Sequence, residues 1–179
     1  MPLNALFGFL IKKRLQQIEL FRDNPHLAQL EVFHSLLRMA RYTEWGREHD
    51  YASISTVDDY RARVPIQDYE SVKPYVSRLR KGEQNVLWPT DAKWFAKSSG
   101  TTSDRSKYIP VSREALEDCH YKGGKDMIAL HYQHRPDSKL YQGMSLVIGG
   151  SSSIAQLRAD AYSGDPSAII IRNLPLLVE

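Results

Sequence analysis

The segment from Ser98 to Lys107 holds the side chains of this sequence that are best suited to bind a phosphate group. Four hydroxyls within five residues surround one glycine, in the order Ser98, Ser99, Gly100, Thr101 and Thr102. Glycine adopts backbone angles barred to other residues and lets an anion approach closely. Successive backbone N–H groups in such a turn form a concave anion site. Lys107 adds a flexible point charge suited to a phosphate oxygen, so the segment predicts a phosphate-binding loop.

The same composition also fits a plain polar surface turn, which stays open as the alternative when residue types alone are considered. The loop is not of the Walker type, because Gly100 is not followed five residues later by Gly-Lys-Ser/Thr. The chain also has no Gly-x-Ser-x-Gly nucleophile elbow. A hydrolase of that kind is therefore not predicted.

The other chemically active side chains give weaker patterns. His131 and His134 share helical spacing, but no carboxylate at a fitting offset completes a metal site. Cys119 is the one cysteine, so an intrachain disulfide and a cysteine-based metal site are both excluded, and a reducing cytoplasm is the simplest setting. The turn at 149–153 reads Gly-Gly-Ser-Ser-Ser after an apolar run at 146–148. It is either a second ligand-facing turn at a strand end or a plain loop.

The first ninety residues show the hydrophobic spacing of helices. Apolar residues three and four apart run from Leu3 to Phe21 and again from Leu27 to Ala40, with Pro25 placed at a helix start. We interpret these stripes as two helices that pair in antiparallel fashion. Core packing explains both stripes, and no chemistry is assigned to them.

Two shorter helices follow. Residues 55–58 resemble a capping box with Asp in place of Glu, and they open a helix that ends near Val64 and Pro65. Asp68 is placed to cap a helix over residues 69–81, with Gly82 as its stop. Pro74 inside that stretch favours a break.

The pattern changes to mixed α/β after Pro89. Residues 93–97 and 108–111 read as extended segments on either side of the Ser/Thr/Gly loop, and Ser112 is placed to cap a long helix to about His131. Residues 146–148 are a buried-strand candidate, and the apolar run 168–171 is of ambiguous type. Residues 165–167, Asp-Pro-Ser, indicate a turn and a helix start.

Composition and charge place the chain among ordinary soluble globular proteins. It has 179 residues, of which 42% are hydrophobic and 25% charged, and its net charge is 24 − 21 = +3. No dense basic stripe predicts a nucleic-acid partner. The apolar run near the N-terminus is too short to span a bilayer, and its basic residues 12–14 follow it rather than precede it, unlike a signal peptide.

The loop motif Lys-Ser-Ser-Gly-Thr-Thr at 97–102, with Lys-Tyr-Ile-Pro at 107–110, resembles the first ATP-binding motif of the adenylate-forming superfamily. More narrowly, the chain resembles the bacterial branch of the auxin-responsive Gretchen Hagen family of acyl-acid–amido synthetases. Further segments familiar from that family are Thr-Glu-Trp-Gly at 43–46, Arg-Val-Pro at 63–65, Lys-Gly-Glu-Gln-Asn-Val-Leu-Trp-Pro at 81–89 and Asn-Leu-Pro at 173–175.

The resemblance implies an ATP-dependent ligase that adenylates a carboxylic acid and then transfers the acyl group to an amino acid. Magnesium would bridge the phosphate oxygens. It also implies an α/β fold in which a helical N-terminal segment, residues 1–90, precedes the start of the large mixed-sheet nucleotide-binding domain at residues 91–179. The implied phosphate-binding residues are Ser98, Ser99, Gly100, Thr101, Thr102 and Lys107.

Departures from the family pattern leave three questions. Motifs for adenine, ribose and the mobile C-terminal domain have no counterpart, which indicates an N-terminal fragment that is inactive alone. The stretch Tyr-Lys-Gly-Gly-Lys at 121–125 lacks the arginine that meets the substrate carboxylate in plant members, and Lys125 is a candidate substitute. The paired glycines serve close packing or bending as the alternative. An acyl-CoA ligase-type enzyme and a non-catalytic interaction module remain rival functions.

Overall fold

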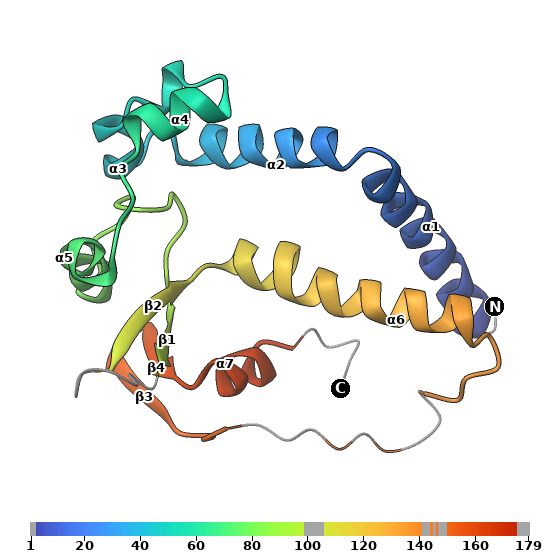
Figure 1. The fold of residues 1–179 in the computed structure, drawn as a ribbon. Coiled ribbons are helices and arrows are strands. Elements are labelled where there is room, and N and C mark those ends of the chain that lie inside the picture. The colour runs from blue at the N-terminus through green and yellow to red at the C-terminus, as the bar shows by residue number, and fades with distance from the viewer. Residues whose placement is uncertain (1–2, 99–105, 141–143, 145, 147–149, 175–179) are drawn as a thin grey trace. The chain divides into compact units, whose positions relative to one another are not determined.

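The computed structural model describes residues 3–98, 106–140, 144, 146 and 150–174, with only the backbone for residues 3–10. The chain forms two compact units (Figure 1). One unit combines residues 1–33 with 114–147, and the other combines residues 34–113 with 148–179. The division at residue 90 into a helical segment and an α/β part stays a prediction.

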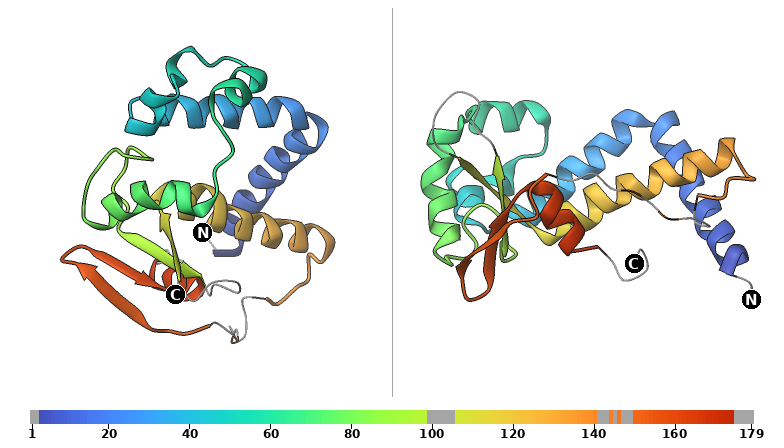
Figure 2. Two further views of the ribbon diagram at one scale, coloured as in Figure 1. Left: turned by 60° about the vertical axis from the view of Figure 1, so that its left-hand side comes forward. Right: turned by 90° about the horizontal axis from the view of Figure 1, so that it is seen from below.

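The first unit is helical and is built on a contact between α1 (Leu3–Asp23) and α6 (Lys122–His134) (Figure 2). Arg14 on α1 binds the Asp126 carboxylate on α6 with both ends of its guanidinium, and the Nη2–Oδ2 distance is 2.7 Å. The Arg14 side chain is 15% exposed. This half-buried pair fixes the register between helices that are distant in the sequence.

The predicted antiparallel pairing of the first two helices is wrong. Only Asn24 separates α1 from α2 (Pro25–Ala40), and its backbone continues the helical hydrogen bonds to Leu20 and Ala28. A single residue in this conformation cannot reverse the chain. The partner of α1 is α6 instead.

The long helix after the second extended segment is confirmed, with an irregular start. A π-helical stretch, η2 (Ala115–Tyr121), runs directly into α6, and α6 ends at His134 rather than near His131. An added Cβ at Gly123 or Gly124 would meet no described atom within 4 Å. No described atom therefore packs closely against the paired glycines.

The second unit contains a four-stranded mixed sheet. Its strands are β1 (Trp94–Ser98), β2 (Lys107–Val111), β3 (Ile154–Arg158) and β4 (Ala161–Gly164), in the order β2-β1-β4-β3. β1 pairs antiparallel with β2 and parallel with β4, and β3 pairs antiparallel with β4. The predicted extended segments at 93–97 and 108–111 correspond to β1 and β2, each shifted by no more than one residue at either end.

Two helices pack on the sheet. α5 (Tyr69–Arg80) contributes Val76 and Leu79 to a core around Phe95, which is fully buried on β1. α7 (Pro166–Arg172) contacts β1 and β4, and its Ile169 is 1% exposed. The ambiguous run 168–171 is therefore helical. Pro74 lies inside α5 without breaking it. Gly82, with φ of 100°, follows the end of this helix, as predicted.

A tight turn joins α2 to α3 (Glu44–Glu48). Thr43 is fully buried, and both its backbone N–H and its hydroxyl donate to the Ala40 carbonyl, at 2.9 and 2.7 Å. The same hydroxyl accepts from Gly46 N–H at 3.0 Å. The first amides of α3 then donate to the carbonyls of Asn85 and Val86, at 3.0 and 3.1 Å. The turn thereby holds the segment that brings Val86 into the core.

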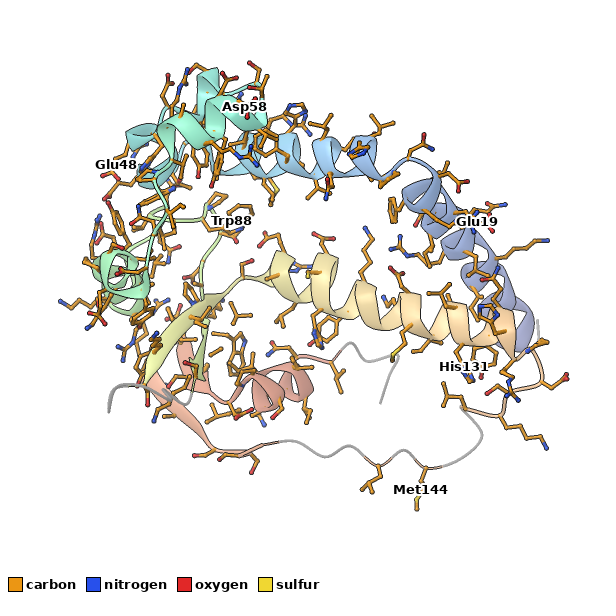
Figure 3. All side chains as sticks on the ribbon, viewed as in Figure 1. Glu19, Glu48, Asp58, Trp88, His131 and Met144 are labelled. Carbon is orange, nitrogen blue, oxygen red and sulfur yellow. The ribbon has the colours of Figure 1, made fainter. Side chains whose placement is uncertain are left out.

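Ion pairs reinforce α3 from α5. Arg78 binds the Glu44 carboxylate through two contacts of 2.5 Å and also binds Glu83. The hydrogen bond from Arg78 is the main reason why the pKa of Glu44 lies below its ordinary value. Tyr75 Oη donates to Glu48 at 3.0 Å (Glu48 is labelled in Figure 3).

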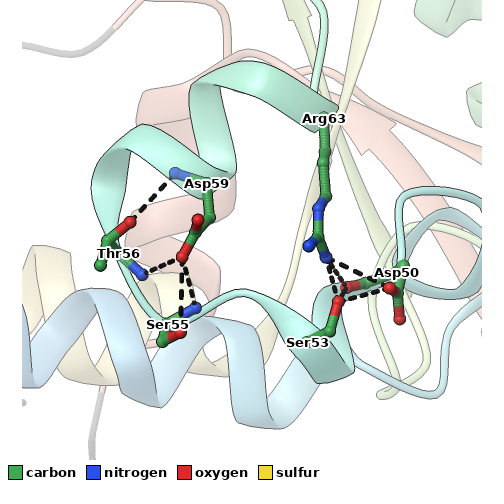
Figure 4. A network of polar contacts seen from close by, with 6 residues as sticks. All are labelled: Asp50, Ser53, Ser55, Thr56, Asp59 and Arg63. Carbon is green, nitrogen blue, oxygen red and sulfur yellow. Dashed lines mark hydrogen bonds and ion pairs between the residues drawn. The ribbon is translucent and has the colours of Figure 1, made fainter.

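The capping box of α4 (Val57–Arg63) is confirmed one residue later than predicted. Thr56 Oγ1 accepts from Asp59 N–H at 3.1 Å, and the Asp59 carboxylate accepts from Thr56 N–H at 2.8 Å (Figure 4). Hydrogen bonds from Thr56 are the main reason why the pKa of the Asp59 carboxyl lies below its ordinary value. Arg63 at the other end of the helix binds Asp50 and Ser53.

Replacing Thr56 with Ala should lower the free energy of unfolding by about 1 kcal/mol, because the N-cap oxygen is lost. Urea unfolding of the full-length protein would measure the change. A Thr56→Ser variant keeps the oxygen and should match the wild type. Equal stability of the Ala and Ser variants would contradict the capping role.

Two further expectations concern the C-terminal half. The strand candidate 146–148 lies largely outside the described residues, and the described Leu146 is in no strand. β3 and β4 were not predicted. Asp165 caps α7 by accepting from Ser167 N–H at 3.0 Å, as the helix-start pattern predicts. Within the described parts of the chain, no helix combines the length and apolar character needed to cross a bilayer.

Candidate functional site

The hairpin β1–β2 frames the predicted phosphate loop. Ser98 at the end of β1 is the cross-strand partner of Lys107 at the start of β2, and both residues are half-buried. Directly opposed residues on antiparallel strands have Cβ atoms about 5 Å apart. The structure thus brings together the two ends of the predicted site. Ser99, Gly100, Thr101 and Thr102 lie outside the described residues.

The sheet gives this hairpin a rigid base. Phe95 on β1 is fully buried. The ring centres of Trp94 on β1 and Tyr162 on β4 lie 5.2 Å apart. Because β1 and β4 are parallel, the carboxyl ends of both strands meet at one edge of the sheet. Ligands of open α/β sheets bind at that edge. Ser98, the last residue of β1, lies there.

The turn at 150–153 reaches the same edge. Ile154, the first residue of β3, pairs with Gly164, the last residue of β4. Gly150 N–H donates to Ser167 Oγ at 2.9 Å, and an added Cβ at Gly150 would lie 2.7 Å from the Asp165 carboxylate. Gly149 lies outside the described residues. The turn therefore packs on the start of α7, next to the strand ends.

Tyr69, in the first turn of α5, contacts both Lys107 and Tyr108 on β2. The Lys107 ammonium lies 5.5 Å from the centre of the Tyr69 ring. Tyr69 Oη accepts from Tyr108 N–H at 2.8 Å and lies 3.4 Å from the Tyr108 carbonyl. β2 lies at one edge of the sheet formed by the four described strands, so this hydroxyl binds backbone groups that no described strand pairs with.

Charged groups on α5 complete the surroundings of β2. The Arg80 guanidinium lies 3.7 Å from the centre of the Tyr108 ring. The carboxylate of Asp68 caps α5, and hydrogen bonds from Ser71 are the main reason why its pKa lies below the ordinary value. The charge of Lys107 contributes in the same direction, which places the ammonium within electrostatic reach of that carboxylate.

Sequence reasoning missed Tyr69. It is 39 residues from Tyr108, and nothing in its neighbourhood distinguishes it from an ordinary first residue of a capped helix. Only the packing of α5 against β2 brings it to the hairpin.

Lys125 lies on α6 and is exposed. It belongs to the unit formed by residues 1–33 and 114–147, whereas Ser98 and Lys107 belong to the other unit. Its role toward a substrate carboxylate stays a prediction. His131 Nε2 is 2.8 Å from Ser138 Oγ at the end of α6 (His131 is labelled in Figure 3). Among the described side chains, no group of three or more His, Cys, Asp or Glu comes together as a metal site.

Comparison with protein families decides the relationship. A model of the GH3 family N-terminal domain matches residues 14–170. This chain belongs to the GH3 family. The match covers the helices, the hairpin and the sheet, and it confirms the resemblance drawn from the loop and its flanking segments.

Curated GH3 relatives share a modest identity with the chain. Indole-3-acetic acid-amido synthetase GH3.5 of Arabidopsis thaliana is 27% identical over 107 residues, which is 59% of this chain and 18% of that protein. Indole-3-acetic acid-amido synthetase GH3.2 of the same plant is 28% identical over 106 residues, which is 59% of this chain and 19% of that protein. The matched stretch is therefore under a fifth of the length of these relatives.

Solved GH3 structures share the fold. The chain of GH3.15 acyl acid amido synthetase matches with a TM-score of 0.76 and 21% identity, over 89% of this chain and 28% of that chain. The mixed α/β architecture is thus that of the N-terminal region of a GH3 amido synthetase, as predicted. This chain spans less than a third of the structure it matches.

Proposed function

We propose that the protein is an ATP-dependent acyl-acid–amido synthetase, to which this chain contributes the phosphate-binding hairpin. The observation that carries the proposal is the pairing of Ser98 with Lys107 across the ends of the Ser/Thr/Gly loop. Family membership supports it, because the matched relatives are named amido synthetases.

The reaction has two steps. A carboxylate oxygen of the acid attacks the α-phosphorus of ATP, and the bond to the departing pyrophosphate breaks. The amine of an amino acid then attacks the acyl carbon, AMP leaves, and the nitrogen loses a proton. The acid belongs to the class of small carboxylic acids named in the relatives, such as indole-3-acetic acid.

In this proposal the hairpin holds the β- and γ-phosphates. The proposed groups are the hydroxyls and amides of Ser98, Ser99, Gly100, Thr101 and Thr102, and the ammonium of Lys107. They position the nucleotide for in-line attack and stabilise the negative charge that develops on pyrophosphate. Preorganisation matters here, because donors held on paired strands, as Ser98 and Lys107 are, need little rearrangement during the reaction.

Magnesium is proposed to arrive with the nucleotide. The described residues form no group of three or more His, Cys, Asp or Glu for it, and Asp68, a carboxylate within electrostatic reach of Lys107, is occupied as the cap of α5. The ion prefers substrate phosphates to an all-protein cage. It would neutralise phosphate charge when bound.

ATP–pyrophosphate exchange by the full-length protein across a panel of carboxylic acids tests the proposal. Exchange that depends on one class of acid is expected. AMP release should then depend on an amino acid and not on coenzyme A. Release that requires coenzyme A would instead identify an acyl-CoA ligase, and absence of exchange with every acid would favour a non-catalytic role.

A further inference from the structure

Lys107 alone has no strong local reason to hold one conformation. Its side chain is a flexible four-carbon stem with a point charge, and such a charge binds phosphate usefully only where its position is fixed. It starts an edge strand, and the residues just before it are those of the loop. Among the described residues, Tyr69 on α5 contacts the Lys107 ammonium.

Tyr69 restrains Lys107 in two ways. Its hydroxyl binds the outward N–H of Tyr108 at 2.8 Å and lies 3.4 Å from the Tyr108 carbonyl, which holds the β2 backbone beside Lys107. Its ring lies 5.5 Å from the Lys107 ammonium, within the range of a cation–π contact. One side chain thus restrains both the backbone and the charged end of the phosphate-binding lysine.

The start of α5 is itself well fixed. Asp68 and Ser71 cap the helix reciprocally, with Ser71 N–H donating to Asp68 Oδ1 at 2.9 Å and Asp68 N–H donating to Ser71 Oγ at 3.1 Å. Val76 and Leu79 anchor the same helix in the core. A rigid helix start therefore carries Tyr69 to the strand.

We propose that Tyr69 is a positioning residue for the nucleotide phosphates, acting through Lys107. This inference rests on the proposed function and adds to it a residue from outside the loop. Tyr69 does not contact ATP in this proposal. It limits the positions open to the ammonium before ATP arrives, so that less conformational freedom is lost on binding.

A double-mutant cycle in the full-length protein tests the inference, with the ATP dissociation constant measured by calorimetry in four proteins: wild type, Y69L, K107A and the double variant. The dissociation constant stays measurable when turnover is lost. Y69L should weaken ATP binding by about tenfold, because ring and hydroxyl are both removed. In the K107A background the same substitution should change the constant by less than about twofold, since the ammonium that Tyr69 positions is then absent.

Tyr75→Leu is the matched control. Tyr75 is a half-buried tyrosine on the same helix, but its hydroxyl donates to Glu48 and its ring lies against Trp45. The Tyr75→Leu variant should leave the ATP dissociation constant within about twofold of wild type while lowering the melting temperature. A general loosening of α5 would make Tyr69→Leu and Tyr75→Leu alike. Tyr69→Phe keeps the ring and should bind ATP more tightly than Tyr69→Leu.

The outcomes separate the two proposals. Weaker binding by Lys107→Ala combined with a silent Tyr69→Leu would overturn the role of Tyr69 and leave the phosphate site intact. If Tyr69→Leu weakened ATP binding by the same factor in the wild type and in Lys107→Ala, that would also overturn it, because the effect would not pass through Lys107. Unchanged binding by Lys107→Ala would remove the phosphate role of that lysine and, with it, the basis for Tyr69.

Discussion

Replacing Lys107 with Ala in the full-length protein should lower ATP–pyrophosphate exchange by about 100-fold or more. The ammonium is the charged group at the described end of the phosphate loop, opposite Ser98. Losing one preorganised donor to a developing negative charge costs other enzymes about 100- to 1,000-fold in rate. Steady-state exchange measured against ATP concentration would show the loss.

Lys93 offers a matched control for that substitution. It is an exposed lysine beside the opposite end of β1, so Lys93→Ala removes the same charge from the same hairpin without touching the loop. Exchange should stay within about twofold of wild type, because a charge at that distance is screened by salt. Lys107→Arg should recover part of the lost exchange, since the positive charge remains but sits on a planar guanidinium instead of a compact ammonium. Equal exchange by Lys107→Ala and wild type would refute the phosphate-binding hairpin.

Thr101→Ala tests the loop independently. The hydroxyl is one of the predicted donors, and its removal should also reduce exchange by orders of magnitude if the loop closes around the phosphates. A normal exchange rate for Thr101→Ala beside a low rate for Lys107→Ala would restrict the site to the strand ends.

Features set by neighbouring residues could be predicted from the sequence. The caps of α5 and α7 depend on Asp68 and Asp165 and on residues two or three positions later, so a short sequence pattern carries them. The box of α4 was misplaced by one residue because Ser55 and Thr56 are both good caps. The loop motif was recognisable for the same reason, since its donors are consecutive.

Features set by distant contacts could not be predicted. The residues of α1 show helical spacing, but that spacing does not say that α1 contacts α6, more than 80 residues away along the chain. β4 reads Ala-Tyr-Ser-Gly and is recognisable only when it lies buried beside β1. Tyr69 was missed at the candidate site because its importance arises only from the packing of α5 on β2.

Replacing Gly46 with Ala should be strongly destabilising. An ideal Cβ at Gly46 would lie 2.1 Å from the Ala40 carbonyl oxygen and 3.1 Å from the Arg41 carbonyl carbon. Both atoms belong to the backbone, so no side chain can rotate away. The Ala40 oxygen also accepts two bonds from Thr43, at 2.9 and 2.7 Å, and cannot retreat without losing them. The cost comes from contact alone, because Gly46 is not among the residues with positive φ.

The strain should spread from the turn to the core. Displacing α3 would stretch the bonds from Glu44 and Trp45 to the carbonyls of Asn85 and Val86. Val86 is 1% exposed and packs with Phe95. Overpacking a tight site costs about 1–3 kcal/mol and occasionally more, and this case should lie at about 3 kcal/mol or above. In a domain of about 200 residues that corresponds to a fall in melting temperature of roughly 10 °C, and in a larger domain the fall is smaller.

Gly123→Ala is the opposite case within the same chain. Its added Cβ meets no described atom within 4 Å, and Gly123 lies in the first turn of α6. Alanine is favoured over glycine inside helices by about 0.5–1 kcal/mol, so the melting temperature of this variant should rise slightly. Thermal unfolding of both variants of the full-length protein tests the pair. Equal melting temperatures for Gly46→Ala and wild type would show that the turn between α2 and α3 is looser than its hydrogen bonds indicate.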